Sequence, residues 1–122
     1  MRETARLASQ WKLNYKMPKY RKLVRDRIPE IIKENGGVPQ TRILTKKEFK
    51  EELLKKLVEE AKEAYKSKEK DGLISELADI QEVLLSVYEI YSINCSDVTK
   101  IARKKRKERG AFNKRIYLES VK

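Results

Sequence analysis

The sequence predicts an all-α protein: an antiparallel helical bundle that is completed when copies of the chain associate. Apolar residues recur at helical spacing over two long stretches. A capping box and a glycine mark where helices begin and end. Further apolar residues lie off the main stripes, and this second apolar face predicts packing against another subunit. Its members are Leu54, Val58, Val83 and Leu85.

The chain of 122 residues has the length of one domain. Residues 1–16 differ in character from the rest of the chain, so we treat them as an N-terminal extension and residues 17–122 as a single helical domain. Arg2, Arg6 and Ser9 fit a targeting peptide only weakly, because the segment lacks an apolar core. No apolar run approaches the roughly 18 residues of a membrane helix. We therefore expect a cytoplasmic protein that does not enter a membrane.

The first expected helix follows Ile28 and ends near Asn35. Pro29 biases Ile28 away from the helical region and itself suits a first helical position. Glu30 then lies in the first turn, where the helix dipole favours negative charge. Gly36 and the glycine after it end the helix.

Two long helices come next. Thr45 and Glu48 have the spacing of a capping box, which predicts a helix running to about Lys68. Asp71 is the expected cap of a second helix over about 72–92. The first has an apolar stripe of Phe49, Leu53, Leu57, Ala61 and Ala64 or Tyr65, and the second of Leu73, Ile74, Leu77, Ile80, Leu84, Val87, Tyr88 and Tyr91.

A third, strongly basic helix is expected over about 97–109. Ser96 can cap it, and Gly110 suits the position just after its end. Val98, Ile101 and Ala102 would face inward. Short strands near 41–44 and 115–118 could pair with each other.

The composition excludes several kinds of chemistry. The chain has no His, which removes Ser-His-Asp triads, Cys-His dyads and histidine metal ligands. A single Cys excludes an internal disulfide and a cysteine zinc cluster. A bound metal must therefore be held mainly by carboxylates, which favours a hard ion such as Mg²⁺, with Mn²⁺ as the alternative.

Charge is distributed unevenly along the chain. The formal net charge is +11, yet residues 48–97 hold 13 acidic and 7 basic side chains. The flanking segments, 1–47 and 98–122, are both basic. Two interpretations stay open at this point: solvated helix faces with basic tails, or a carboxylate metal site beside a phosphate-binding surface.

Two pairs of acids lie on the two long helices. Glu60 and Glu63 are three residues apart, as are Glu76 and Asp79, so each pair shares a helix face. A turn near 68–71 makes the helices antiparallel and sets both pairs at similar heights. Four such carboxylates repel one another unless a cation neutralises them. A solvated acidic face is the competing interpretation, because Glu-rich helix surfaces are common.

The order E-x-x-E, twelve residues, E-x-x-D resembles the signature of the MazG-like all-α nucleotide pyrophosphohydrolases. Four segments resemble a small branch often labelled phosphoribosyl-ATP pyrophosphohydrolase-like. They are LVRDRIPEIIKENG (23–36), KLVEEAKEAY (56–65), SELADIQEVL (75–84) and RKERGAFNKRIYLE (106–119). The resemblance covers about residues 19–119.

The resemblance implies a Mg²⁺-dependent enzyme that cleaves a nucleoside triphosphate between its α and β phosphates. The products are a nucleoside monophosphate and pyrophosphate, as in a house-cleaning enzyme. On this chain the implied metal ligands are Glu60, Glu63, Glu76 and Asp79, and Glu59 is a candidate for orienting or deprotonating the attacking water.

The resemblance also implies cationic groups for the substrate. Lys105 and Arg109 match the family's Lys followed about four residues later by Asn or Arg, and Phe112 is a candidate base-stacking aromatic. A solvated basic helix end is the competing interpretation. Arg25 is a further phosphate candidate, although we expect Asp26 to hold Arg25 or Arg27 structurally.

The chain departs from true histidine-pathway enzymes, because it lacks the His that follows their ADL-type segment. Phosphoribosyl-ATP pyrophosphohydrolase activity is therefore an alternative and not the main prediction. A basic helical nucleic-acid-binding or regulatory protein without catalysis is the other alternative. The expected partners are a nucleotide substrate and further copies of the chain, as a homodimer or a dimer of dimers.

Overall fold

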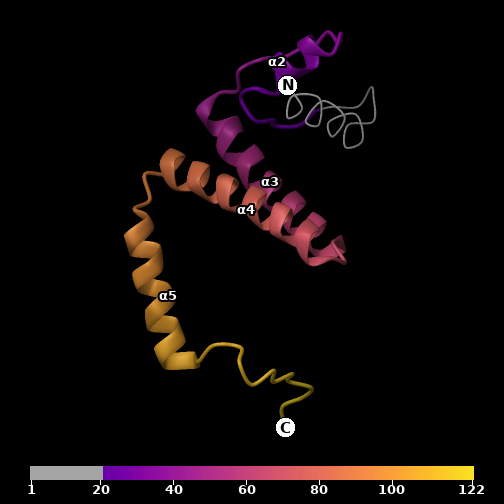
Figure 1. Ribbon diagram of the computed structural model, residues 1–122. Coiled ribbons are helices and arrows are strands. Elements are labelled where there is room, and N and C mark those ends of the chain that lie inside the picture. Colours follow the sequence, from indigo (N-terminus) through magenta and orange to yellow (C-terminus); the bar gives the residue numbers. More distant parts are fainter. Residues whose placement is uncertain (1–20) are drawn as a thin grey trace.

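The computed structural model describes residues 21–122, and the expected extension over residues 1–16 lies outside them. The described chain is all-α, as predicted. Its helices are labelled as in Figure 1: α2 (Ile28–Glu34), α3 (Lys46–Lys66), α4 (Lys70–Ile90) and α5 (Cys95–Arg109). Figure 1 shows α3 and α4 packed as an antiparallel hairpin, with α5 leading away from the end of α4.

Helix α2 ends where its sequence predicts but begins one residue earlier, at Ile28, because a proline disfavours the helical region for the residue before it without excluding it. Pro29 lies in the first turn with Glu30 beside it. At the other end, the Asn35 side-chain amide donates a hydrogen bond to the carbonyl of Ile31 at 2.8 Å. Gly36 follows with φ of 84°, in the left-handed region where glycine meets no steric penalty.

Helix α3 begins with the predicted capping box. The Glu48 backbone N–H donates to Thr45 Oγ1 at 3.2 Å, and the Thr45 N–H donates to Glu48 Oε1 at 3.1 Å. Arg42 adds a 2.8 Å contact to the same carboxylate. The Arg42 hydrogen bond, followed by that from the Thr45 backbone, lowers the pKa of Glu48 to about 2. The cap is therefore charged at any ordinary pH.

Helices α4 and α5 begin two residues earlier than predicted. Asp71 is not the cap of α4; it lies in the first turn, where it still meets the positive end of the helix dipole. Ser96 is not the cap of α5, because Asn94 accepts a hydrogen bond from the Ser96 N–H at 3.1 Å. Asparagine caps as well as serine does, and it comes first along the chain. Gly110 ends α5 with φ of 83°, as predicted.

The predicted short strands over 41–44 and 115–118 are absent from the described chain, so that prediction was wrong. Ile43 is 94% exposed, and Ile116 is also exposed. An isolated pair of short strands, without a third strand or a packed face, is only marginally stable in water. Arg42 instead bonds to the α3 cap.

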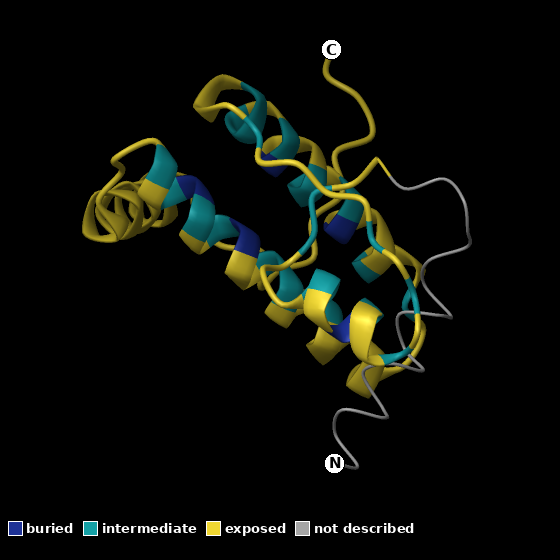
Figure 2. Ribbon diagram, turned by 90° about the horizontal axis from the view of Figure 1, so that it is seen from above, coloured by how far each residue is buried: buried dark blue, intermediate teal, exposed yellow. Residues whose placement is uncertain are grey.

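The core is small and lies between α3 and α4. Leu53, Val83 and Val87 are buried together, and the partly buried residues packed on them are Leu23, Phe49, Leu57 and Ile90. In Figure 2 the buried positions of the hairpin lie on its facing sides. Val83 is thus part of this core and does not belong to the second apolar face to which the sequence assigned it.

Each hairpin helix also carries a second apolar stripe, which the rest of the described chain leaves exposed. On α3, Leu54, Val58 and Tyr65 recur at helical spacing. On α4 the exposed apolar residues are Leu73, Ile74, Leu77 and Leu85. The sequence assigned the first three to the core-facing stripe, and that assignment was wrong for the single chain, because the core lies farther along α4 at Val83 and Val87. Helix α5 is exposed on all sides (Figure 2), so Val98, Ile101 and Ala102 do not face inward in the single chain.

Among residues 21–122, no helix combines the length and the apolar character that crossing a membrane requires.

Candidate metal centre

Three carboxylates from the hairpin converge on one point. Glu60 on α3 and Glu76 and Asp79 on α4 each offer an oxygen, and these oxygens all lie within 4.8 Å of one another. The short connection between α3 and α4 makes the helices antiparallel and sets the acids at the same height. Three of the four acids identified in the sequence therefore meet in the structure.

The helix register explains why these acids point inward. Glu60 follows the buried Leu53 by seven residues, and Glu76 precedes the buried Val83 by seven. Seven residues are close to two helical turns, so both acids occupy core-facing positions. Glu60 is accordingly buried, with 9% of its surface exposed. Glu60 and Glu76 thus lie at positions where the helix pattern predicts apolar residues, whereas Asp79 keeps 39% of its side chain exposed.

Burial and mutual repulsion change the protonation of the pair. Burial, followed by repulsion from Glu60 and Asp79, raises the pKa of Glu76 to about 7. Burial also raises the pKa of Glu60, although the nearby Lys56 opposes this shift. A hydrogen bond between the two carboxyl groups fits Glu76 as the protonated partner. Without a cation, the cluster holds a proton that ordinary glutamates would have lost.

Basic side chains from before α2 contact the same region. Arg25 Nη2 lies 2.7 Å from Asp79 Oδ1, and Lys22 Nζ lies 2.7 Å from Glu59 Oε1. The expectation that Asp26 holds Arg25 or Arg27 was wrong, because Arg25 bonds to Asp79 and Arg27 to Glu30. Sequence reasoning missed Lys22, since nothing local indicates a partner 37 residues away.

Two of the predicted acids lie beside the cluster and not in it. Glu63 is exposed, and its Oε1 lies 3.9 Å from Lys66 Nζ. Its carboxylate is still near enough to Glu76 for its charge to contribute to the raised pKa of Glu76. Glu59 is half-buried between Lys22 and Lys56. Its role as a base and that of Glu63 as a fourth ligand stay predictions.

The predicted substrate contacts on the C-terminal side are not brought to the carboxylates of the same chain. Lys105 and Arg109 lie toward the end of α5, which leads away from the hairpin (Figure 1). Phe112 follows α5 and is 96% exposed. Their proposed contacts with phosphate and base stay predictions.

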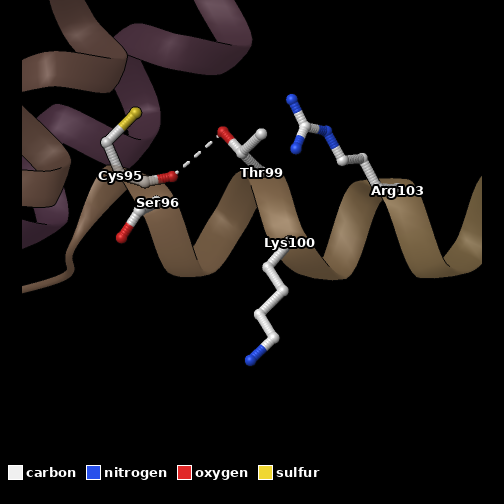
Figure 3. A pocket seen from close by; sticks show the side chains of 5 residues that line it. All are labelled: Cys95, Ser96, Thr99, Lys100 and Arg103. Carbon is white, nitrogen blue, oxygen red and sulfur yellow. Dashed lines mark hydrogen bonds between the residues drawn. The ribbon is translucent and has the colours of Figure 1, made fainter.

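A depression at the start of α5 is a weaker candidate site. Figure 3 shows the residues that line it, all from one helix: Cys95, Ser96, Thr99, Lys100 and Arg103. Thr99 Oγ1 donates to the Cys95 carbonyl at 3.1 Å, as in many helices. All five residues are exposed and no second element closes the depression, so it offers no enclosed chemistry.

The carboxylate cluster, by contrast, has the donor set that a hard divalent ion prefers. Its donors are all oxygens, they come from two rigid helices, and the three carboxylates, once all are ionised, carry more negative charge than Lys56 and Arg25 neutralise. Burial, and after it repulsion from Glu60 and Asp79, raises the pKa of Glu76, so a bound cation would favour its charged form. Glu60, Glu76 and Asp79 therefore fit such an ion.

Comparison with protein-family models, with curated proteins and with solved structures found no match to this chain.

Proposed function

We propose that the chain is a Mg²⁺-dependent nucleotide pyrophosphohydrolase of the MazG-like all-α superfamily, from the phosphoribosyl-ATP pyrophosphohydrolase-like branch. It cleaves a nucleoside triphosphate between the α and β phosphates and releases a monophosphate and pyrophosphate. The observation that supports the proposal is the convergence of oxygens from Glu60, Glu76 and Asp79 within 4.8 Å, with Glu60 and Glu76 at core-facing positions. The spacing of the same acids carries the resemblance to that superfamily.

Each acid has a proposed task. Glu60, Glu76 and Asp79 hold the ion, and Glu63 completes the set from the edge of the cluster. A bound Mg²⁺ (or Mn²⁺) supplies positive charge for the phosphate oxygens and acidifies a coordinated water. Glu59 orients that water once its carboxylate is released from Lys22. Glu76 loses its proton when a cation binds, so cation binding strengthens as the pH rises through about 7.

The physiological role that suits this site is house-cleaning, the removal of noncanonical or excess nucleotides. The absence of His makes a step in histidine synthesis the weaker alternative. Lys105, Arg109 and Phe112 are proposed to contact phosphate and base, and a site assembled from two chains is one way for α5 to reach them.

We also propose that the working form is a homodimer or a dimer of dimers. Apolar stripes on α3 and α4 stay exposed in the single chain. Two hairpins packed through these stripes would form a four-helix bundle.

The test is a panel of nucleoside triphosphates with Mg²⁺, in which pyrophosphate and orthophosphate are measured separately. We expect pyrophosphate and the monophosphate, and loss of both when a chelator removes the metal. Orthophosphate with a diphosphate would contradict cleavage between the α and β phosphates. Absence of turnover on the whole panel, phosphoribosyl-ATP included, would contradict the enzyme.

A second candidate function rests on α5 alone. Six of the seven residues over 103–109 are basic, and the helix is exposed throughout. Such a helix can contact the phosphates of a nucleic acid without reading its sequence. This function predicts salt-sensitive binding to duplex or single-stranded DNA that Asp79→Ala leaves unchanged or raises. The enzyme predicts that Asp79→Ala loses cation binding.

A further inference from the structure

Residues 22–25, here called the strap, lie near the start of the described chain and contact the acids of the candidate site. Leu23 packs on the core formed by Leu53, Val83 and Val87, which fixes the strap against the hairpin. Two basic side chains flank Leu23. Lys22 Nζ donates to Glu59 Oε1 and Arg25 Nη2 donates to Asp79 Oδ1, each at 2.7 Å. One apolar anchor thus sets two positive charges on the candidate site.

These two contacts differ from the other ion pairs within residues 21–122. The others join residues at most six apart, mostly on successive turns of one helix. Lys22 and Arg25 instead bridge 37 and 54 residues. Long-range placement of this kind requires the fold, and both contacts end on acids to which the proposed function gives a task.

We propose that, in the absence of a divalent cation, the positive charges of the strap neutralise the acids of the site. When the cation binds, Arg25 exchanges Asp79 for an anionic phosphate group of the substrate. This inference rests on the proposed function. While the cluster holds no ion, Arg25 neutralises a ligand and Lys22 neutralises Glu59. When a divalent ion takes Asp79, the guanidinium is left beside the ion, where phosphate oxygens lie.

The exposure and chemistry of Arg25 suit such an exchange. Its side chain is 57% exposed, so its pair with Asp79 is screened by water and easily given up. Its planar guanidinium matches two phosphate oxygens at once, which a lysine cannot do. The anchor Leu23 keeps the guanidinium near the site throughout, so the exchange needs only side-chain rotation.

The exchange predicts effects of opposite sign for the cation and the anion. Removing the guanidinium frees Asp79, so the affinity for Mg²⁺ rises. The same change removes a phosphate contact, so the affinity for Mg²⁺-pyrophosphate falls. Loss of a merely structural contact would lower both affinities together.

Calorimetric titration of the full chain tests the first effect. Mg²⁺ is titrated at pH 8 into the wild type, Arg25→Gln and Arg27→Gln. Arg27 is the matched control, because it lies in the same segment and pairs with Glu30 outside the cluster. We expect Arg25→Gln to bind Mg²⁺ about two- to fivefold more tightly than Arg27→Gln does. Equal affinities in the two variants would overturn the proposal.

Titration of pyrophosphate at saturating Mg²⁺ tests the second effect. We expect Arg25→Gln to bind about tenfold more weakly than the wild type, and Arg27→Gln to bind as the wild type does. Arg25→Lys, which keeps the charge but not the fork, should bind Mg²⁺ as the wild type does and pyrophosphate more weakly. Weaker binding of both Mg²⁺ and pyrophosphate by Arg25→Gln would overturn the exchange.

The two proposals fail in different ways. A wild-type chain that binds no Mg²⁺ would contradict the metal centre itself, and the strap with it. A wild-type chain that binds Mg²⁺ and pyrophosphate, with Arg25→Gln behaving like Arg27→Gln, would contradict the strap alone.

Discussion

At the scale of single residues, Glu60 and Glu76 conflict with the packing of their own helices. Both occupy core-facing positions two turns from a buried aliphatic residue, where a leucine would stabilise the hairpin. The raised pKa of each shows that the fold disfavours its charged form. Residues that reduce stability at a buried position are typical of functional sites.

The first prediction at this scale concerns Glu60→Gln. Loss of a buried ligand carboxylate should reduce pyrophosphate release at least about 100-fold and weaken Mg²⁺ binding. Glu82→Gln is the matched control, because it is the same substitution at an exposed position of α4. Pyrophosphate assays and calorimetry on both variants check it. Equal activities would remove Glu60 from the site.

The second prediction concerns pH and stability. The pKa of Glu76 is about 7 in the folded chain, against 4.5 for an ordinary glutamate. Between these values the folded state binds the extra proton, so stability without metal falls as the pH rises from 4.5 to 7. Screening by water limits the loss to about 1 kcal/mol, or about 4 °C in the melting temperature.

Thermal unfolding at pH 5 and pH 8, at one protein concentration and with a chelator present, measures this loss. Glu76→Gln should flatten the pH dependence, whereas Glu82→Gln should keep it. Added Mg²⁺ should restore stability at pH 8, because a ligand that binds only the folded state stabilises it. A wild-type chain that is more stable at pH 8 than at pH 5 would contradict the assignment.

At the scale of elements, the start of α3 is the best-determined helix end. Thr45 and Glu48 satisfy each other's backbone N–H groups, and Arg42 adds a third contact. Thr45→Ala should lower the free energy of unfolding by about 1 kcal/mol. Lys47→Ala, at an exposed position in the same turn, should change it little. Urea unfolding measures both, and an equal effect of the two substitutions would show that the cap contributes nothing.

Elements could be predicted from the sequence where their signals are local. The capping box, Pro29 and Gly110 each determine a helix end through neighbours at most a few residues away. Asp71 and Ser96 gave wrong predictions of two helix starts, because Asp and Ser are favoured N-cap residues in general. The N-caps in the structure are Glu69 and Asn94, each two residues earlier.

The candidate site was predictable only in part. The predictable part is the one that depends on residues close together in the sequence. The spacing of Glu60, Glu76 and Asp79 on two helices joined by a short turn determines their meeting. Glu63 shares the face of Glu60 by spacing, but its rotation about α3 leaves it exposed. The contacts of Lys22 and Arg25 depend on how the strap crosses the hairpin, which no local pattern records.

At the scale of the whole molecule, the exposed apolar stripes are the basis of the proposed association between copies of the chain. Val58→Ser with Leu85→Ser should shift the chain toward smaller species by removing apolar contact area from both stripes. Lys55→Ser with Glu82→Ser is the control, since it changes two exposed polar positions and leaves the net charge unchanged. Light scattering on size-separated protein checks it. A wild-type chain that is monomeric at micromolar concentration would contradict the prediction.

One hairpin carries Glu60, Glu76 and Asp79 together, all within twenty consecutive positions of the chain. The spacing of the three acids is therefore inherited as a unit, and substitutions outside the hairpin leave that spacing unchanged. Helix α5 is exposed throughout, so its sequence can diverge without disturbing the acids, whereas Lys22 and Arg25 ahead of α2 contact Glu59 and Asp79. If the proposed function holds, descendants of this chain could exchange one nucleotide preference for another while the three acids kept their arrangement.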